Sequence, residues 1–324
     1  MYLNLSLGKN SGGVVAAAPK VLDSAYFALS TRKVVSSYAG NAMKVKVGSV
    51  EADVAFDSSN EVSLSSAITV TSGSSSATTL GGLTTGNLDA RVVTWYNQGS
   101  ASINAAQSIE SRQPKIVASG NLQLNSNGDT SLLFNNHTNW MICNGQVFTN
   151  DLSAIYGYSE HNDGFYGGGL TVLCAQYSFG VQGRGGFGAS SNGQSFNIIV
   201  TTEGADLLRS RDWVSEGGNF DVNDSVNPTI ASSYKTPALS GNAKWMQADT
   251  VNGKPTSGFG SNATSTFNNI LYASVDTQIG GGNETFAAKW DGYITEIITM
   301  KGTFSESDWE SGFSEINDQF GVYS

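Results

Sequence analysis

The chain has 324 residues, of which 27 are acidic and 17 are basic, and its formal net charge is −10. This balance disfavours nucleic acid and anionic membrane surfaces as partners, because both require clustered lysine and arginine, and the basic residues form no cluster along the sequence. With 38 glycines, 5 prolines and 39% hydrophobic residues, the composition predicts a globular chain of many short strands joined by polar turns.

Residues 1–20 are expected to form an arm outside the main core. Leu3, Leu5 and Leu7 alternate with polar residues, which is the pattern of a strand with one apolar face. Such a strand has to be covered, either by its own domain or by a neighbouring subunit. We therefore expect the arm to anchor the protein on another chain, and residues 21–324 to form one domain.

Neither an export signal nor a membrane span is expected. The first residues lack a basic start followed by an apolar block, so no secretory signal is predicted. No apolar run is long enough to cross a bilayer. We expect a protein that is made in a cytoplasm and is not exported by the secretory route.

The segment after the arm is predicted to begin with a short helix. Asp23 can cap a helix over residues 25–33, and Arg32 and Lys33 lie near its end, where the helix dipole favours basic groups. Residues 43–47 then alternate strictly and predict a half-buried strand, and residues 50–56 continue in the same style. The serine-rich run 72–79 predicts an exposed loop.

The run from Arg91 to Gln98 is predicted to contain the central strand. Its middle, Val92 to Tyr96, consists of β-branched and aromatic residues, which favour a pleated and packed surface. A short apolar run closed by polar residues is typical of a strand buried on both faces, although a buried helical segment shows the same pattern. Trp95 and Tyr96 point to opposite faces, so we expect the chain to pack around this strand.

The remaining elements are predicted to be strands, followed by one helix. The stretch 164–188 is expected to form wide loops at one rim, and 215–235 is expected to be a loop. Ser305 and Asp308 open a helix at capping-box spacing, and one face of it is expected to pack on the core through Trp309, Phe313, Ile316 and Phe320. Strands are predicted at 113–117, 131–134, 154–158, 170–174, 197–200, 270–273 and 291–298.

The chain offers little material for metal or cofactor chemistry. Cys143 and Cys174 lie in apolar runs, where buried thiols are favoured over a disulfide. With two histidines and no cysteine pair at ligand spacing, neither a structural zinc site nor a catalytic triad is expected. The glycine-rich run 183–188 lacks the lysine and the helix of a phosphate loop, so no cofactor is predicted.

Several segments together resemble one family. Residues 30–47 resemble the "RxLxSxYxGxAxxVRR" opening of arabinofuranosidase-B-like domains, and 93–98 resemble their "VTTWYDQSGNG" segment. Residues 113–117 match "QPKIV", and 279–298 resemble the closing "IGG…F.G.I.EII" strands. The resemblance implies an all-β, concanavalin A-like antiparallel sandwich (jelly roll), here with a short N-terminal helix and a C-terminal helix. Such domains occur in fungal α-L-arabinofuranosidases and in tailed-phage virion proteins, and the arm is similar to the phage members.

Two departures from the family pattern argue against hydrolysis. Asn97 replaces the aspartate of the family motif, and Gly282 stands where the resemblance puts the catalytic acid. A glycosidase needs two carboxyl groups at the scissile bond, and neither Gly282 nor its neighbour Asn283 can donate a proton. Glu284 lies two residues further on, a displacement of about 6–7 Å along a strand. We therefore predict a protein that is not an enzyme.

A glycan-binding site is predicted near the middle of the chain. Glu160 and Asp163 belong to a polar cluster with Asp151 and His161, which could bind a sugar or a metal, and for which a solvated loop is the favoured interpretation. Nearby aromatic residues can stack on sugar rings or pack in the core, and the candidates are Phe165, Tyr166, Tyr177 and Phe179.

Three hypotheses follow for the function. The first is a structural virion protein of a tailed phage, as a head fibre, decoration or tail appendage. It would act as a homo-oligomer that binds other virion proteins through its arm, and a host-surface glycan is a further partner that it could bind. The second is a carbohydrate-binding module, and the third is an arabinofuranosidase-like hydrolase.

Overall fold

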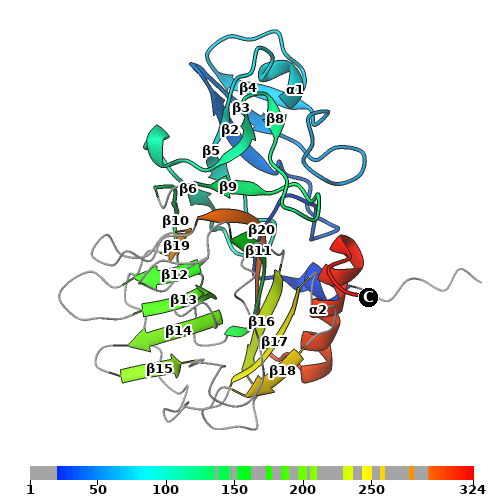
Figure 1. Cartoon of the computed structure of the whole chain (residues 1–324), viewed down its shortest axis with the longest axis vertical. Coiled ribbons are helices and arrows are strands. Elements are labelled where there is room, and N and C mark those ends of the chain that lie inside the picture. The colour runs from blue at the N-terminus through cyan, green and yellow to red at the C-terminus, as the bar shows by residue number, and fades with distance from the viewer. Residues whose placement is uncertain are drawn as a thin grey trace, which may run out of the picture.

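A computed structural model describes residues 20–135, 138–145, 147, 152–161, 173–176, 184–189, 196–202, 205–209, 229–235, 243–249, 256–259, 277–280 and 291–324. Within these ranges the protein is an antiparallel β-sandwich with a long C-terminal helix (Figure 1). No helix of the described ranges combines the length and the apolar character that crossing a membrane requires.

The strand pairings divide into two sheets that share β5 (Ala90–Trp95). One edge of β5 pairs with β2, and its other edge is divided between β6 and β7. Sheet I runs β4 (Ile68–Ser72), β3 (Val50–Val54), β2 (Met43–Val47), β5, β6 (Ala105–Ala106), β10 (Met141–Cys143), β19 (Thr277–Ile279), β12 (Leu173–Gln176), β13 (Arg184–Ala189), β14 (Phe196–Thr202) and β15 (Ala205–Arg209).

Sheet II leaves β5 through β7 and reaches the C-terminal strand. That strand, β20, pairs along one edge with β11 and along the other with β9 and β1. The members of sheet II are β8 (Asn121–Leu122), β7 (Lys115–Ala118), β9 (Leu132–Phe134), β20 (Gly292–Lys301), β1 (Phe27–Ser30), β11 (Leu152–His161), β16 (Thr229–Lys235), β17 (Ala243–Asp249) and β18 (Thr256–Phe259).

The two sheets enclose the main core. Alternate residues of β2 are buried, as are Ala90, Val92 and Trp95 of β5, where a register shift interrupts the alternation. Phe27, Leu29 and Ile297 meet them from sheet II in one continuous cluster. Since residues of a strand alternate between faces, the other face of sheet II is left to bury its own apolar residues against a third layer.

The third layer is α2 (Glu306–Phe320), which lies alongside β16 and also contacts β11 (Figure 1). The predicted capping box is present, because the Ser305 and Asp308 side chains each bond the other residue's backbone amide. All four predicted core residues of the helix are buried in a second cluster with Tyr156 and Ile298, namely Trp309, Phe313, Ile316 and Phe320. The predicted C-terminal packing helix is confirmed.

The prediction of a helix over residues 25–33 is wrong. A short 3₁₀ helix, η1 (Val21–Ser24), precedes the strand β1 instead. Phe27, Ala28 and Leu29 are all fully buried, which a strand between two cores allows and a surface helix does not. Asp23 accepts a hydrogen bond from the Ser36 amide, 13 residues further on, instead of capping a helix.

Two predicted loop regions contain strands. Residues 164–188 include β12 and most of β13, and residues 215–235 include β16. β13 pairs on both edges, with β12 and with β14, so tertiary pairing overrides the low strand propensity of its glycines. The exposed loop after Ser72 is confirmed; it ends at Thr79, which caps the one-turn helix α1 (Leu80–Leu83).

The other strand predictions are confirmed at shifted bounds. β7, β9, β11, β12, β14 and β20 lie on their predicted segments, and the predicted strand 270–273 lies outside the described residues. β5 is central, and Trp95 and Tyr96 do point to opposite faces, but only the Trp95 face is fully buried. The face that carries Tyr96 is half-buried, which corrects the expectation of burial on both sides.

The two cysteines lie on strands that are not neighbours. β10 carries Cys143 and β12 carries Cys174, and β19 lies between them and pairs with both. Two strand spacings amount to about 9.5 Å, whereas the Cα atoms of a disulfide lie within about 7 Å. The topology therefore argues against a disulfide between them.

Candidate functional site

Of the predicted glycan-binding residues, the structure describes the side chain of Glu160 alone. Asp163, Phe165, Tyr166, Tyr177 and Phe179 lie outside the described residues. The same holds for Asp151, for the proposed acid position at Gly282 with Asn283 and Glu284, and for Leu3, Leu5 and Leu7 of the arm. In the part of the chain that is described, no three His, Cys, Asp or Glu side chains gather in a way that could hold a metal ion.

Glu160 lies at the end of β11 and holds a turn of the chain. Its Oε2 atom accepts a hydrogen bond of 2.6 Å from the Ser126 amide, and its side chain is nearly buried, with the residue 3% exposed. Two positions earlier on the same face of β11, the Tyr158 hydroxyl donates to Asp129 Oδ2 at 2.6 Å. Both bonds clamp the turn 125–129 onto sheet II, so Glu160 is not a residue of a solvated loop.

The same turn is also tied to the helix. Asn125 Oδ1 accepts from the Asn127 and Asp129 amides, and the Asn127 side chain donates to the Phe320 carbonyl at 2.7 Å. Phe320 in turn packs against the ring of Tyr158, with centroids 4.6 Å apart. The turn thus joins β11 to the last turn of α2, and Glu160 is one of its fixed points.

Burial sets the electrostatics of Glu160. Desolvation raises the pKa of its carboxyl, and the hydrogen bonds from Ser126 oppose that shift only in part. Tyr293 is its partner on β20, and burial together with the nearby Glu160 charge raises the pKa of that phenol. A carboxyl with a raised pKa is what a proton donor needs, but this one is enclosed and bonded to the turn, which assigns it a structural role.

A Glu160→Gln substitution is expected to flatten the pH dependence of stability. The folded protein binds this proton more tightly than the unfolded chain, so Glu160 stabilises the fold below its ordinary pKa of 4.5. That contribution is lost as the pH rises through the raised value. Urea unfolding from pH 4 to 8 should show wild type losing stability relative to the variant. Glu310→Gln, on the exposed face of α2, is the control, and parallel curves for wild type and Glu160→Gln would contradict the assignment.

Two described residues that flank segment 281–290, which carries Gly282, both lie at Phe134. Gly280 has a positive φ of 70°, and a Cβ there would lie 2.3 Å from the Phe134 ring. Gly292 pairs with Phe134 across β9 and β20, and also with His161 at the end of β11. The sheet therefore brings the flanks of the predicted acid position beside the strand end that carries Glu160. Sequence reasoning treated these two regions separately.

The residues that carry the family resemblance form an internal network. Arg32 of the opening segment and Glu296 of the closing segment form a buried ion pair, with Arg32 Nη2 donating to Glu296 Oε1 at 2.9 Å. Gln98 bridges to the opening segment, accepting from the Val34 amide and donating to the Arg32 carbonyl, both at 2.7 Å. These residues are buried and bonded to one another, so they specify the architecture.

Asn97 also belongs to this network. Its Oδ1 atom accepts from the Ala28 amide at 2.7 Å and the Gly99 amide at 2.9 Å, and its Nδ2 group donates to the Ala101 carbonyl. Gly99 is required by a close approach, because a Cβ there would lie 2.5 Å from the Tyr26 carbonyl oxygen. The departure from aspartate at this position is therefore explained by backbone bonding and carries no information on catalysis.

Three solved structures of arabinofuranosidases are similar to this fold. An arabinofuranosidase complexed with arabinofuranosyl-α-1,2-xylobiose aligns with a TM-score of 0.58 at 13% identity, over 92% of this chain and 64% of that one. A substituted GH54 α-L-arabinofuranosidase soaked with 4-nitrophenyl α-L-arabinofuranoside gives 0.56 at 11% identity, over 92% of this chain and 65% of that one. A GH54 enzyme soaked with a cyclic sulfate inhibitor gives 0.55 at 12% identity, with the same coverage.

The chain thus spans just under two thirds of the length of these neighbours. No family model matches the sequence, and no curated protein matches it. At this level of identity the likeness establishes the fold, an arabinofuranosidase-like antiparallel β-sandwich.

Proposed function

We propose that this protein binds carbohydrate through its β-sandwich and does not hydrolyse it. The observation that carries the proposal is the similarity over 92% of the chain to an arabinofuranosidase complexed with arabinofuranosyl-α-1,2-xylobiose. Gly282 at the position of the expected acid, and the enclosed carboxyl of Glu160, support binding without catalysis. Binding a glycan needs hydrogen bonds and aromatic contacts, whereas hydrolysis also needs a proton donor and a second carboxylate.

We expect micromolar to millimolar binding of arabinoxylan oligosaccharides with no release of arabinose. Titration calorimetry measures the binding, and 4-nitrophenyl α-L-arabinofuranoside reports hydrolysis. The matched control is Glu284→Gln, which removes the remaining carboxyl near the expected acid position. Release of 4-nitrophenol that disappears in this control would identify Glu284 as the proton donor and support the hydrolase instead.

A second proposal concerns where the protein acts. We infer a tailed-phage virion as its place, with a homo-oligomer attached to other virion proteins through residues 1–20 and a host glycan as its target. The support is the one-faced pattern of Leu3, Leu5 and Leu7 and the resemblance to phage members of the family. Co-purification with assembled particles tests it, and a protein that stays behind when particles are purified would contradict it.

A further inference from the structure

The outer face of sheet I carries a group of half-buried aromatic and charged residues far from Glu160. Pairing places Asp53 of β3, Lys44 of β2 and Thr94 of β5 in one row across three strands. Residues directly opposite one another in a sheet lie on the same face. The row continues to Ala106 and Ile142, which are exposed, so this side of the sheet faces solvent there.

The Tyr96 side chain reaches across this face. Tyr96 follows β5, yet its hydroxyl donates a hydrogen bond of 2.7 Å to Oδ1 of Asp53, on the far side of β2. β5 and β3 are two strand spacings apart, about 9.5 Å, so the side chain has to extend along the sheet instead of standing upright. The side chain therefore crosses the outer face of β2 to reach β3. The half-buried state of Tyr96 agrees with this arrangement.

The Tyr96 ring is held at its hydroxyl end by the bond to Asp53. Burial and the bond to Asp53 raise the pKa of Tyr96, so its hydroxyl stays a donor at neutral pH. Tyr38 lies close enough to contribute to that shift; its own hydroxyl donates to the Asn41 carbonyl at 2.9 Å, and its ring meets Phe56 edge-on at 6.4 Å. A fixed aromatic ring loses little entropy when a ligand stacks on it.

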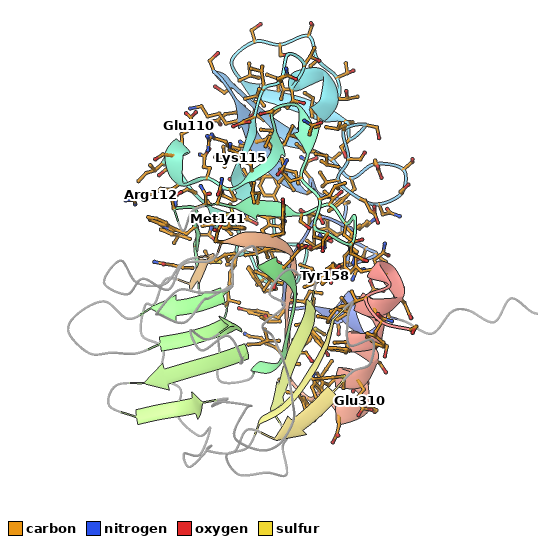
Figure 2. The ribbon with its side chains drawn as sticks, in the orientation of Figure 1. Glu110, Arg112, Lys115, Met141, Tyr158 and Glu310 are labelled. Atoms are coloured by element: carbon orange, nitrogen blue, oxygen red, sulfur yellow. The ribbon has the colours of Figure 1, made fainter. Side chains whose placement is uncertain are left out.

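The charges around this face balance one another. Lys46 bonds Glu110 at 2.7 Å, and Lys115 bonds Asp89 at 2.6 Å (Figure 2 labels Glu110 and Lys115). Four basic and four acidic side chains are brought together by pairing or ion contact, namely Lys44, Lys46, Arg91 and Lys115 with Glu51, Asp53, Asp89 and Glu110. A polyanion or a polycation therefore gains no net attraction here. A neutral ligand rich in hydroxyl groups meets both donors and acceptors.

We propose that Tyr96, with Asp53 and Lys44 beside it, forms a binding site for a neutral oligosaccharide on the outer face of sheet I. A sugar ring stacks on the half-buried ring of Tyr96 through its C–H groups. Its hydroxyls donate to the Asp53 carboxylate and accept from the Lys44 ammonium, contacts that a charged partner strengthens. This inference rests on the proposed carbohydrate binding and assigns it a surface separate from the strand ends at Glu160.

The site is tested by titrating ¹⁵N-labelled full-length protein with arabinofuranosyl-xylobiose and, separately, with tri-galacturonate as an acidic probe. We expect the neutral probe to shift the amide signals of residues 43–54 and 92–96. Tyr96→Ala should weaken its binding by about tenfold or more, as loss of a central aromatic contact does. Tyr96→Phe, which keeps the ring and removes the bond to Asp53, should weaken it by a smaller factor.

Tyr323→Phe is the matched control, because it removes one hydroxyl from a half-buried tyrosine that packs on α2, and it should leave the affinity unchanged. The assignment to sheet I is overturned if the neutral probe binds Tyr96→Ala as tightly as it binds wild type. It is also overturned if the probe shifts only amide signals outside residues 43–54 and 92–96. Carbohydrate binding itself stands in both cases. Tighter binding of tri-galacturonate would overturn the neutral class. If neither probe binds wild type at 10 mM, the site and the proposed function both fail. Because Tyr96→Phe keeps the ring and removes only its hydroxyl, it and the wild-type shift map keep the test valid if Tyr96→Ala does not fold.

Discussion

Replacing Arg32 with alanine is expected to lower the free energy of unfolding by about 3–5 kcal/mol, because it leaves a carboxylate buried without its partner. Glu296 is fully buried in β20, and Arg32 is 5% exposed. Nη2 of Arg32 lies 2.9 Å from Oε1 of Glu296, and Nε lies 2.8 Å from Oε2, although the latter contact is not aligned as a hydrogen bond. Ser30 Oγ donates to the same carboxylate at 2.7 Å and cannot neutralise it.

The loss should extend beyond the ion pair. The Arg32 guanidinium lies 5.2 Å from the centroid of the Phe320 ring, so one side chain connects β20 to the last turn of α2. Urea unfolding measures the change. Lys46→Ala, which removes the exposed ion pair with Glu110, is the control and should have little effect. A double substitution, Arg32→Met with Glu296→Leu, should recover much of the loss, since apolar replacement of a buried pair is often tolerated. Equal stability of wild type and Arg32→Ala would contradict the role given to this pair.

Elements with a local pattern were predictable from the sequence. The strict alternation of residues 43–47 specifies one buried face, and β2 has that burial pattern. The spacing of Trp309, Phe313, Ile316 and Phe320 specifies a helix with one apolar stripe, and its capping residues fix where it starts. In both elements, the residues within the element are enough to determine its secondary structure and its buried face.

The helix prediction for residues 25–33 is wrong because the structure of this segment is decided by a distant strand and not by a local pattern. Phe27, Ala28 and Leu29 are apolar in succession, which fits a strand between two cores as well as a helix. The choice is made by β20, about 270 residues later, through the pairs from Phe27 with Thr299 to Ser30 with Glu296. No local signal in this stretch reports that pairing. The same holds for the glycine-rich β13, which is a strand because both its edges are paired.

The candidate sites show the same limit. Glu160 was selected as a polar residue after a strand, but its bond to Ser126 depends on a turn 34 residues earlier in the chain. The basic residues form no cluster along the sequence, yet pairing of β2, β5 and β7 places Lys46, Arg91 and Lys115 in one row. Asn97 and Gln98 were visible as part of a motif, and only the folded contacts show that the motif is structural.

Replacing Trp309 with alanine is expected to destabilise the fold by about 3–5 kcal/mol, the usual range for removing a buried aromatic side chain. Trp309 is 1% exposed and stacks on Tyr234 with ring centroids 5.5 Å apart, and its indole N–H donates to Ser232 Oγ at 3.0 Å. Both partners lie on β16, so the cavity would open directly between α2 and sheet II and weaken the docking of the helix.

Trp309→Phe keeps a ring but leaves Ser232 without its donor, and an intermediate loss of stability is expected. Glu310→Ala, one residue later on the exposed face of α2 (Figure 2), should leave the unfolding midpoint unchanged. Far-ultraviolet circular dichroism during urea unfolding follows the helix directly, and a Trp309→Ala protein as stable as Glu310→Ala would show that α2 is not held to the sheet by this contact.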